Sequence, residues 1–246
     1  MKDTSIDDPQ ASLDHAAIIR KKYALNQLYT EYYLHFKNSI AAIKGGKILE
    51  LGSGGGFIKE VIPDAITSDV VPIAGCDLVV FAEKLPFENE SLKAILMIDV
   101  LHHVKTPEEF FKEALRCLVP GGKIIMVEPA NTLWAKFIWK TFHHEPFDDK
   151  AGWIIKGDGR MSDANIALPW ILFGRDRTLF EKKFPQLNIN SLKIHTPVAY
   201  ILSGGVKPWN LLPKFLFAPV RFIEKTVSGL KQGMFQTIEV EKISTR

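Results

Sequence analysis

The chain has 246 residues, 46% hydrophobic and 24% charged, with a formal net charge of +3, a composition typical of globular rather than disordered proteins. The mild charge, without any stretch that concentrates Lys and Arg, gives no reason to expect a nucleic-acid partner. Two cysteines, Cys76 and Cys117, are too few for a disulfide framework. The acidic start differs from a signal peptide, and no apolar window is long enough to span a membrane. We therefore expect a cytoplasmic protein.

The first half of the chain predicts helices followed by alternating strands and helices. Residues 1–14 are polar and acidic, and we expect them to be frayed, whereas the apolar spacing in residues 15–43 predicts two short helices. Beyond them we expect strands at 47–51, 65–70, 78–81, 94–98 and 123–127, and helices at 57–62 and 106–118. This alternation predicts a doubly wound α/β fold, with a mostly parallel sheet and helices on both faces.

Local signals mark the ends of the helix expected at 106–118. Thr106 is its expected N-cap, Pro107 suits the first helical position, and Glu109 completes a capping box. Gly121 and Gly122 are expected to close the helix before the fifth strand begins.

The alternation stops at residue 129. Residues 130–175 are rich in Trp, Phe, His and Gly and are too long for a connecting loop, so we expect an insertion that shapes a substrate pocket. We expect a helix at 176–184, a strand at 192–202, an amphipathic helix at 212–230 and a strand at 235–243 to follow. The whole chain, 1–246, is predicted to be one domain, with a core at 45–130, a lid at 131–185 and C-terminal strands and helix at 186–246.

The glycine-rich loop after the first strand indicates a ligand. A dinucleotide-binding loop needs G-x-G-x-x-G, but Phe57 stands where its third glycine would be. The loop instead reads E-x-G-x-G-x-G from Glu50 to Gly56, and a carboxylate there repels a diphosphate but suits an ammonium or a sulfonium. Asp69 follows 19 residues after Glu50, at the expected end of the second strand, where an acid accepts hydrogen bonds from two ribose hydroxyls. A nucleoside that carries an amino acid and a positive centre is S-adenosylmethionine.

Four segments follow one another in this core: ILELGSGGGF, SDV, AEKLPFENESLKAILMIDVLHHV and EEFFKEALRCLVPGGKIIMVEP. Together they resemble the class I, Rossmann-like S-adenosylmethionine-dependent methyltransferases, in particular the small-molecule subgroup, over residues 45–130. The resemblance implies a seven-stranded sheet with an antiparallel last strand, N-terminal helices and a helical insertion after the fifth strand. It also implies methyl transfer from S-adenosylmethionine, with S-adenosylhomocysteine as the product.

The resemblance implies a role for each matching position. The implied cofactor residues are Glu50, Gly52, Ser53 and Gly54 at the methionine end, Asp69 at the ribose, Ala82 and Glu83 along the adenine, and Asp99 and Val100 beside the sulfonium. The family usually has an acid at the position of Phe81, in contact with the adenine amino group. Two substitutes are open: the Phe81 ring stacks against the adenine, or Glu83 takes over the contact.

Two histidine pairs are candidates for acid–base chemistry. His102 and His103 follow the fourth strand, at the sheet edge where ligands bind, and either is a candidate general base or a residue packed under the next helix. His143 and His144 begin the segment HHEPFDD, in which Glu145 or Asp148 could orient a histidine ring. We name His103 and His144 as the catalytic candidates.

The remaining site predictions concern metals and the methyl acceptor. The potential ligands in HHEPFDD, with His102 and His103 nearby, could also indicate a metal site. We expect none, because adjacent histidines point in different directions and no i, i+4 spacing supports zinc. The candidate substrate contacts are Tyr23, Glu128, His143 and Trp153. Glu128 ends the fifth strand, and two interpretations of it are open: a contact with a polar substrate group or one with a neighbouring backbone.

Two aromatic stretches, LWAKFIWKTF and PWNLLPKFLFAPVRF, bear on the nature of the acceptor. Each is amphipathic and carries Lys or Arg, which is typical of helices that cover a substrate pocket or of helices that lie on a membrane. We favour the first interpretation; peripheral membrane contact would indicate a lipid or lipid-linked acceptor. We therefore predict methyl transfer to an oxygen, nitrogen or carbon atom of a small or lipid-like acceptor. The alternative is a protein of the same fold that binds the cofactor without transferring the methyl group.

Overall fold

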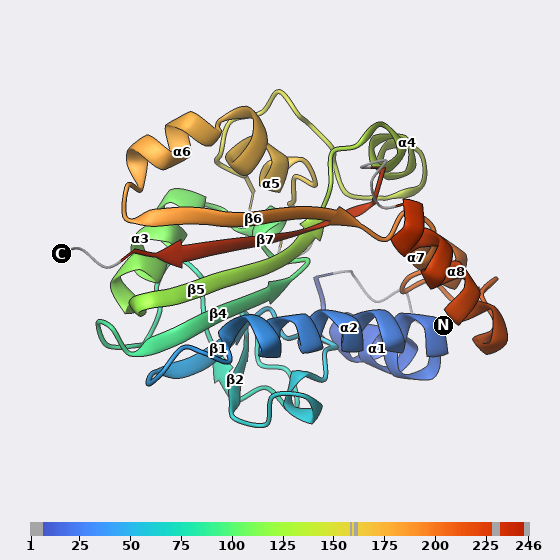
Figure 1. The fold of residues 1–246 in the computed structure, drawn as a ribbon, viewed down its shortest axis with the longest axis horizontal. Helices are drawn as coiled ribbons and strands as arrows, with labels where there is room; N and C mark the ends of the chain where they lie inside the picture. Colours follow the sequence, from blue (N-terminus) through green and yellow to red (C-terminus); the bar gives the residue numbers. More distant parts are fainter. Residues whose placement is uncertain (1–6, 158, 160–161, 228–231, 244–246) are drawn as a thin grey trace.

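A seven-stranded sheet forms the centre of the protein (Figure 1). The computed structural model describes residues 7–157, 159, 162–227 and 232–243. The strands lie in the order β3-β2-β1-β4-β5-β7-β6, and they are β1 (Lys47–Leu51), β2 (Ala65–Asp69), β3 (Leu78–Val79), β4 (Leu92–Ile98), β5 (Leu118–Pro129), β6 (Leu187–His195) and β7 (Phe235–Lys242). Strands β1 to β5 pair in parallel, whereas β7 is antiparallel to both of its neighbours. The predicted doubly wound sheet with an antiparallel last strand is confirmed.

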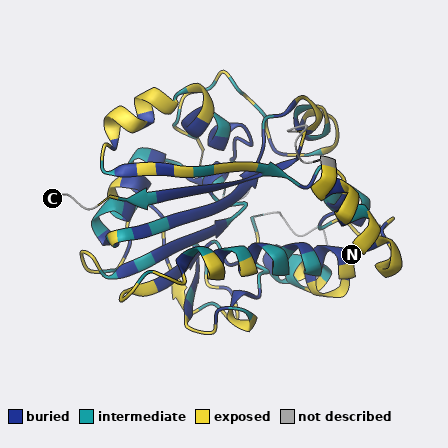
Figure 2. Cartoon of the chain, in the orientation of Figure 1, coloured by how far each residue is buried: buried dark blue, intermediate teal, exposed yellow. Residues whose placement is uncertain are grey.

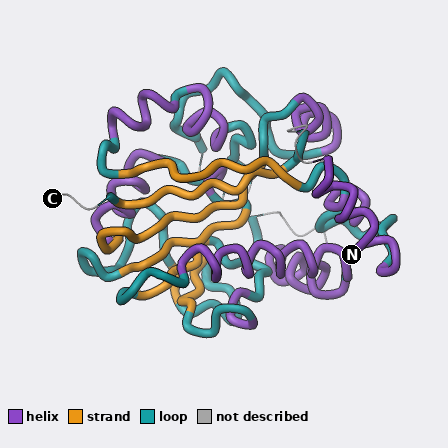
Figure 3. Tube along the Cα trace, in the orientation of Figure 1, coloured by secondary structure: helices purple, strands orange, loops and turns teal. Residues whose placement is uncertain are grey.

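Helices cover both faces of the sheet (Figures 1 and 3). They are α1 (Pro9–Lys21), α2 (Tyr23–Ile40), α3 (Pro107–Cys117), α4 (Leu133–Phe142), α5 (Leu168–Trp170), α6 (Arg177–Lys183), α7 (Ala199–Ser203) and α8 (Lys214–Val227), with the short turns η1 (Ile58–Glu60), η2 (Leu101–His103) and η3 (Ile171–Arg175). Helices α3, α5 and α6 pack on one face, and α2, α4, α7 and α8 pack on the other. Within the described ranges, no helix is both long and apolar enough to cross a membrane.

Strand β4 contributes apolar side chains to both faces of the sheet. Ala94, Ile95, Leu96 and Met97 are all fully buried (Figure 2). Ile95 and Met97 belong to the core under α3 and α6, whereas Ala94 and Leu96 belong to the core under α2 and α4. Side chains alternate between the two faces of a strand, so a strand between two helical layers is apolar at every position.

The chain after β6 differs from the strand expected at 192–202. Strand β6 ends at His195, and the next segment forms helix α7. Oε1 of Glu224, on α8, accepts the N–H groups of Val198 and Ala199 at 2.7 Å each and so caps the start of α7. The local apolar pattern could not indicate this helix, because its cap comes from a different helix.

Both ends of α3 differ from the predicted capping box and glycine stop. The Thr106 side chain makes no capping hydrogen bond. Instead, Oε1 of Glu83 accepts the N–H groups of Lys105 at 3.0 Å and Thr106 at 3.2 Å. At the other end, β5 begins at Leu118, directly after the helix, and residues 121–122 lie inside that strand, at a break in its register with β4.

Three smaller predictions also need correction. Helix α1 begins at Pro9, within the segment expected to be frayed, because Asp8 accepts the N–H of Gln10 at 2.8 Å and Pro suits the first helical position. The helix expected at 57–62 is only the turn η1, since Pro63 leaves room for little more than one turn. Strand β3 has two residues, and residues 228–230 of the expected last helix lie outside the described part of the chain.

A buried lysine ties the N-terminal helices to the loop after α7. Lys22 lies between α1 and α2, and burial lowers the pKa of its ammonium group. Its Nζ donates to the backbone oxygens of Ser203 and Gly205 at 2.8 Å each, of Trp209 at 2.7 Å, and of Lys207. These carbonyl groups replace the water that the charge loses on burial, and they fix the loop in place.

Replacing Lys22 with methionine should lower the free energy of unfolding by about 2–4 kcal/mol, because buried carbonyl groups would lose a charged donor. Lys21, exposed and one position earlier, offers the matched control, and Lys21→Met should change the stability by less than about 0.5 kcal/mol. Urea unfolding followed by circular dichroism measures both variants. Equal stabilities of the two variants would contradict the role given to Lys22.

Candidate active site

A cavity of about 410 Å³ lies at the carboxyl ends of β1, β2 and β4. Open α/β sheets bind their ligands at this edge. The cavity is lined by Glu50, Gly52, Ser53, Gly54, Asp69, Ala82, Glu83, Asp99, Val100 and His103, among other residues. The fold thus brings all the cofactor positions implied by the sequence, and one of the two catalytic candidates, into a single cavity.

Close packing accounts for two glycines of the loop. Gly52 has a φ of +62°, and a Cβ atom there would lie 2.4 Å from Cγ2 of Val100. A Cβ atom on Gly55 would lie 2.5 Å from the backbone nitrogen of Ala16, so α1 rests directly on the loop. Only glycine permits these approaches. The loop is therefore held between the turn after β4 and the N-terminal helix.

Glu50 lines the cavity with a buried carboxylate. Its side chain is 2% exposed, and Oε2 has no hydrogen-bond partner among the residues that the structure describes. Burial raises the pKa of the Glu50 carboxyl group to about 7, although hydrogen bonds with Ser53 and Tyr33 oppose the shift. A buried acceptor without a donor is costly, and an ammonium group is the ligand chemistry that would pair with it.

Asp69 supplies a second carboxylate to the same cavity, at the end of β2. The residue is 5% exposed, and Oδ1 accepts the N–H of Val70 at 2.8 Å. A Cβ atom on Gly54 would lie 3.9 Å from Oδ2 of Asp69, which shows how near the carboxylate is to the glycine loop. Glu50 and Asp69 therefore face one space large enough for a nucleoside.

Phe81 stands where the resemblance implies an acid in contact with the adenine. Phe81 is 60% exposed and lines the cavity, so its ring has a free face. Oε1 of Glu83 is already used by the backbone N–H groups of Lys105 and Thr106. Of the two substitutes for the missing acid, these contacts favour stacking by Phe81.

Glu128, at the end of β5, fixes the turn that follows β4. It is fully buried, and its Oε1 accepts the N–H groups of Val100 at 2.9 Å and Leu101 at 2.7 Å, while Oε2 lies 2.7 Å from Nδ1 of His102. The contact with a neighbouring backbone is therefore the one observed, and Glu128 is absent from the described lining of the cavity. The same turn holds Asp99 at a φ of +55°, where burial raises the pKa of its carboxyl group to about 7.

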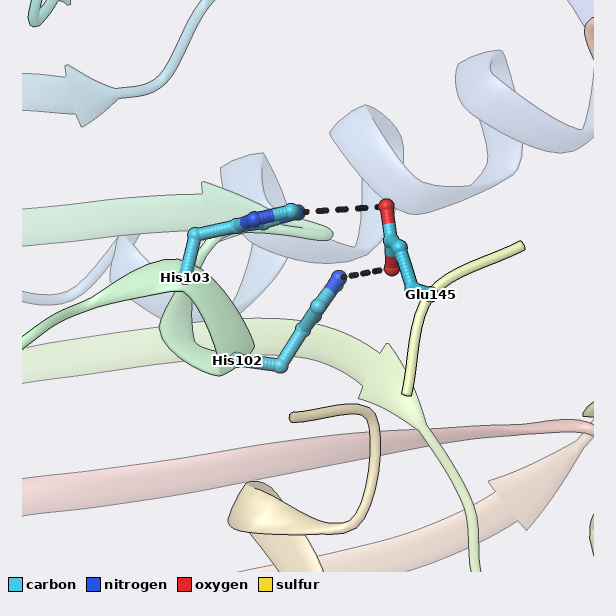
Figure 4. A group of neighbouring side chains, drawn as sticks. All are labelled: His102, His103 and Glu145. Carbon is cyan, nitrogen blue, oxygen red and sulfur yellow. Dashed lines mark ion pairs between the residues drawn. The ribbon is translucent and has the colours of Figure 1, made fainter. Parts of the chain in front are cut away.

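Four histidine rings surround the carboxylate of Glu145, and Figure 4 shows two of them. Its oxygens lie 3.3 Å from Nε2 of His102, 3.6 Å from Nε2 of His103, 3.9 Å from Nδ1 of His143 and 3.7 Å from Nε2 of His144. The expectation that adjacent histidines point in different directions was wrong. The turn η2 sets the rings of the first pair 4.2 Å apart, and the rings of the second pair stack at 4.7 Å.

The cluster contains charged and neutral imidazoles. Burial lowers the pKa of His102, but Glu128 and Glu145 outweigh this effect and hold the pKa well above its ordinary value. Burial and the neighbouring His102 lower the pKa of His103 to about 3, and burial lowers that of His143 to about 4. Burial by itself would raise the pKa of Glu145, but the neighbouring histidines lower it to about 2. His103 is therefore a neutral imidazole in the cavity wall at neutral pH.

Other predicted contacts lie away from the cavity. Tyr23 packs edge-on against Phe217, with ring centroids 5.7 Å apart, and Nε1 of Trp153 donates to Oδ2 of Asp176 at 2.9 Å. The pair His143–His144 lies near the carboxylate of Glu145, and none of these predicted residues belongs to the cavity lining as far as the chain is described. Their aromatic or polar character indicated a site but not its location.

The N-terminal helices contribute cavity residues that the sequence analysis missed. Ser12, His15 and Ile19 of α1 and Tyr29 and Tyr33 of α2 all line the cavity. Helical periodicity was the available signal, and it indicates an apolar face without showing which residues on that face reach a ligand.

Comparison with known proteins agrees with this geometry. Residues 74–126 match the protein family described as "Methyltransferase domain". The chain is 27% identical over 166 residues to the probable tRNA methyltransferase 9B of Bos taurus, covering 57% of this chain and 35% of that protein. It is 27% identical over 124 residues to the mitochondrial ubiquinone biosynthesis O-methyltransferase of Arabidopsis thaliana, covering 41% and 38%. The chain thus spans little more than a third of the length of these relatives.

A solved structure extends the likeness over nearly the whole chain. Geranyl diphosphate C-methyltransferase from Streptomyces coelicolor A3(2), in complex with Mg²⁺, geranyl diphosphate and S-adenosyl-L-homocysteine, matches with a TM-score of 0.50 and 13% identity, covering 99% of this chain and 90% of that one. At this identity the likeness shows the fold alone. Residues 74–126 thus match a methyltransferase domain, and the fold is one that solved methyltransferases share. The cofactor of that class is S-adenosylmethionine, and the unpaired oxygen of Glu50 fits its ammonium group.

The raised pKa of Glu50 predicts that cofactor binding weakens in acid. Below pH 7 the carboxyl group must lose a proton before it can pair with an ammonium group, so the affinity for S-adenosylhomocysteine should fall roughly tenfold from about pH 8 to about pH 6. Calorimetric titration at both pH values measures this change.

The variant Glu50→Gln isolates the contribution of Glu50, because Asp99 titrates in the same range. This variant should bind at least about tenfold more weakly at alkaline pH and lose most of the pH dependence. A wild-type affinity that is constant over the range would contradict the assignment.

Proposed function

We propose that this protein transfers a methyl group from S-adenosylmethionine to a small or lipid-like acceptor. The observation that carries the proposal is the buried, unpaired Oε2 of Glu50, which shares a cavity with Asp69. These carboxylates would recognise the ammonium and ribose groups of one ligand. The methyltransferase domain matched by residues 74–126 supports the same activity.

Positioning is the main task of the protein in this reaction. When bound, S-adenosylmethionine would supply a methyl group activated by its sulfonium: the acceptor atom would attack the methyl carbon in line, the bond from that carbon to sulfur would break, and S-adenosylhomocysteine would leave. Glu50 and Asp69 would hold the two ends of the cofactor, and the turn at Val100, fixed by Glu128, would form the wall beside the methyl group. Helix α1, which rests on the glycine loop, would keep water from the reacting atoms.

A general base is needed only when the acceptor atom carries a proton. His103 is our candidate, because its neutral imidazole lines the cavity. The lowered pKa of His103 makes it a weak base, which suits an acceptor whose proton is already acidic. We assign no proton transfer to His144, because it lies outside the described cavity lining.

Exposed apolar side chains favour a lipid-like acceptor. The side chains that are between 55% and 81% exposed include Leu133, Phe137 and Phe142 of α4 and Phe215, Phe222 and Ile223 of α8 (Figure 2). Both helices lie at the end of the sheet to which the carboxyl ends of β4 and β5 point (Figure 1). Nε1 of Trp134 donates to the backbone oxygen of Pro197 at 2.7 Å, which joins α4 to the segment leading into α7.

The charges on these helices suit an anionic lipid surface. Helix α4 has two lysines and no acidic residue. The acid of α8 is Glu224, which is buried in an ion pair with Arg221. Lys214 and Lys225 lie near the two ends of the helix, and Nζ of Lys225 is 3.9 Å from Glu31. An apolar face bordered by lysines binds membranes that carry negative charge. We therefore infer that α4 and α8 dock on an anionic membrane from which the acceptor enters.

The names of the relatives do not fix the acceptor, since they include tRNA, ubiquinone biosynthesis and geranyl diphosphate. A tRNA acceptor would require a strongly basic surface. The chain has 31 basic and 28 acidic residues and no basic stripe, so we favour the lipid-like acceptor.

Asp69→Ala should weaken binding of S-adenosylhomocysteine at least tenfold, or about 1.4 kcal/mol, because the ribose would lose its acceptor. Asp64→Ala, an exposed acid at the opposite end of β2, is the matched control and should bind as the wild type does. Calorimetry measures both affinities, and an unchanged affinity of Asp69→Ala would refute the ribose assignment.

Methyl transfer itself is tested by incubating the chain with methyl-labelled S-adenosylmethionine and either a lipid extract or a pool of water-soluble metabolites. We expect label in the lipid fraction, reduced in Asp69→Ala. Binding of S-adenosylhomocysteine with no labelling of either pool would favour the alternative, a binding protein without transfer.

Flotation with vesicles tests the membrane inference. The chain should float with vesicles rich in phosphatidylglycerol, and the double variant Phe137→Glu, Phe222→Glu should reduce the bound fraction roughly tenfold, since two aromatic side chains would no longer enter the lipid. Leu179→Glu, an exposed apolar position on α6, is the control. Equal flotation of both variants would overturn the docking surface.

A further inference from the structure

We propose that His102, His103 and Glu145 form a site for a divalent transition-metal ion of the zinc class, with one position open toward the cavity. The side chains come from two distant segments, the turn η2 and the segment after α4, and converge as Figure 4 shows. Nε2 of each histidine faces one oxygen of Glu145, and all ligand atoms lie within 4.8 Å of one another. Two imidazoles and a carboxylate are a ligand set that zinc uses in sites with an open position.

The distances suit a shared ion better than direct ion pairs. A direct contact between a charged imidazole and a carboxylate is about 2.7–2.9 Å long, as is the 2.7 Å contact between His102 and Glu128. The contacts of Glu145 are longer, at 3.3 Å to His102 and 3.6 Å to His103. Two ligand atoms bound at about 2.0–2.1 Å to one tetrahedral ion lie about 3.3–3.4 Å apart. An ion therefore fits between these atoms with small adjustments.

Glu128 orients His102 in the way that an outer carboxylate orients a metal ligand. It lies 2.7 Å from Nδ1 of His102 and so holds a proton on that atom. Nε2 carries the second proton of the charged ring and would release it to solvent when the proposed ion binds. Glu128 is itself fixed by the N–H groups of Val100 and Leu101. Nδ1 of His103 has no partner within the described residues, so its proton can lie on that atom and free Nε2 as well.

The position of His103 gives the ion access to the cavity. His103 belongs to the cavity wall, whereas His143 and His144 are not members of the close group of ligand atoms. The remaining position of a tetrahedral ion would accept an oxygen donor, such as a hydroxyl or phosphate group of the methyl acceptor. With the ion bound, Nε2 of His103 is a ligand and cannot accept a proton, so the general-base role proposed above applies only to the metal-free chain. The assignment of an acceptor oxygen to the ion rests on the proposed function; binding of the ion itself does not.

The sequence has no i, i+4 histidine spacing of the kind that zinc sites use, but this does not argue against the site. Its ligands come from separate segments, so no short motif can contain them. Adjacent histidines can both reach one ion here, because η2 directs their rings to the same carboxylate.

Titration of the chelator-treated chain with Zn²⁺ by calorimetry, and with Co²⁺ by visible absorption, tests the proposal. We expect a single ion per chain and the intense absorption of tetrahedral Co²⁺. Glu145→Gln and His103→Gln should each weaken Zn²⁺ binding at least about tenfold. His35→Gln is the matched control, because His35 forms another histidine–glutamate pair, 3.0 Å from Glu239, and should leave the affinity unchanged.

Weakened Zn²⁺ binding in both variants, with the wild-type affinity for S-adenosylhomocysteine retained in Glu145→Gln, would support the site. No Zn²⁺ binding by the wild type, or equal binding by the wild type and both variants, would overturn it. If Glu145→Gln does not fold, the His103→Gln affinity and the Co²⁺ spectrum decide. Titration of the metal-free chain with S-adenosylhomocysteine tests the proposed function separately from the metal site. If the chain binds Zn²⁺ but not S-adenosylhomocysteine, the metal site stands and the proposed function is wrong.

Discussion

The buried carboxylate of Glu128 holds the site together. The parallel register of β4 with β5 pairs Ile98 with Val127, so the next residue of β5 lies beside the turn that leaves β4. Burying a carboxylate without partners would cost several kcal/mol, and the N–H groups of Val100 and Leu101 together with the ring of His102 offset that cost. The same contacts determine where the turn runs, so the position of Val100 in the cavity wall and the orientation of His102 both follow from one interaction between neighbouring strands.

The N-terminal helices are part of the site as well. Helix α1 approaches Gly55 so closely that no side chain fits between them, and residues of both α1 and α2 line the cavity. Lys22, at the junction of the two helices, binds the loop after α7, from which Val206 also reaches the cavity. The cavity is therefore enclosed by segments from both ends of the chain, around a base formed by the central strands.

The parts that could be predicted from the sequence are those with local causes. Strands such as β4 were recognisable because both faces are buried. Residues at or just beyond strand ends, such as Glu50, Asp69 and Asp99, could be placed at one edge of the sheet because the topology gathers them there. The caps of α3 and α7 could not be predicted, because Glu83 and Glu224 come from remote segments, while a local pattern assigns the role to a neighbour such as Thr106. A metal-binding group around Glu145 was rejected on the sequence alone, since only the fold shows that both histidine pairs approach the same carboxylate.

The burial of Glu50 makes the empty protein less stable than the same fold with a neutral residue would be. Its pKa of about 7 in the folded chain exceeds the ordinary value of 4.5, so the folded state binds a proton between these values and stability falls as the pH rises through that window. Above it the cost is about 3 kcal/mol. An ammonium group bound to the carboxylate would offset that cost, so the cofactor would act as a stabilising ligand, more strongly in alkaline than in acidic solution. The folded fraction of the protein would then depend on its degree of loading with cofactor.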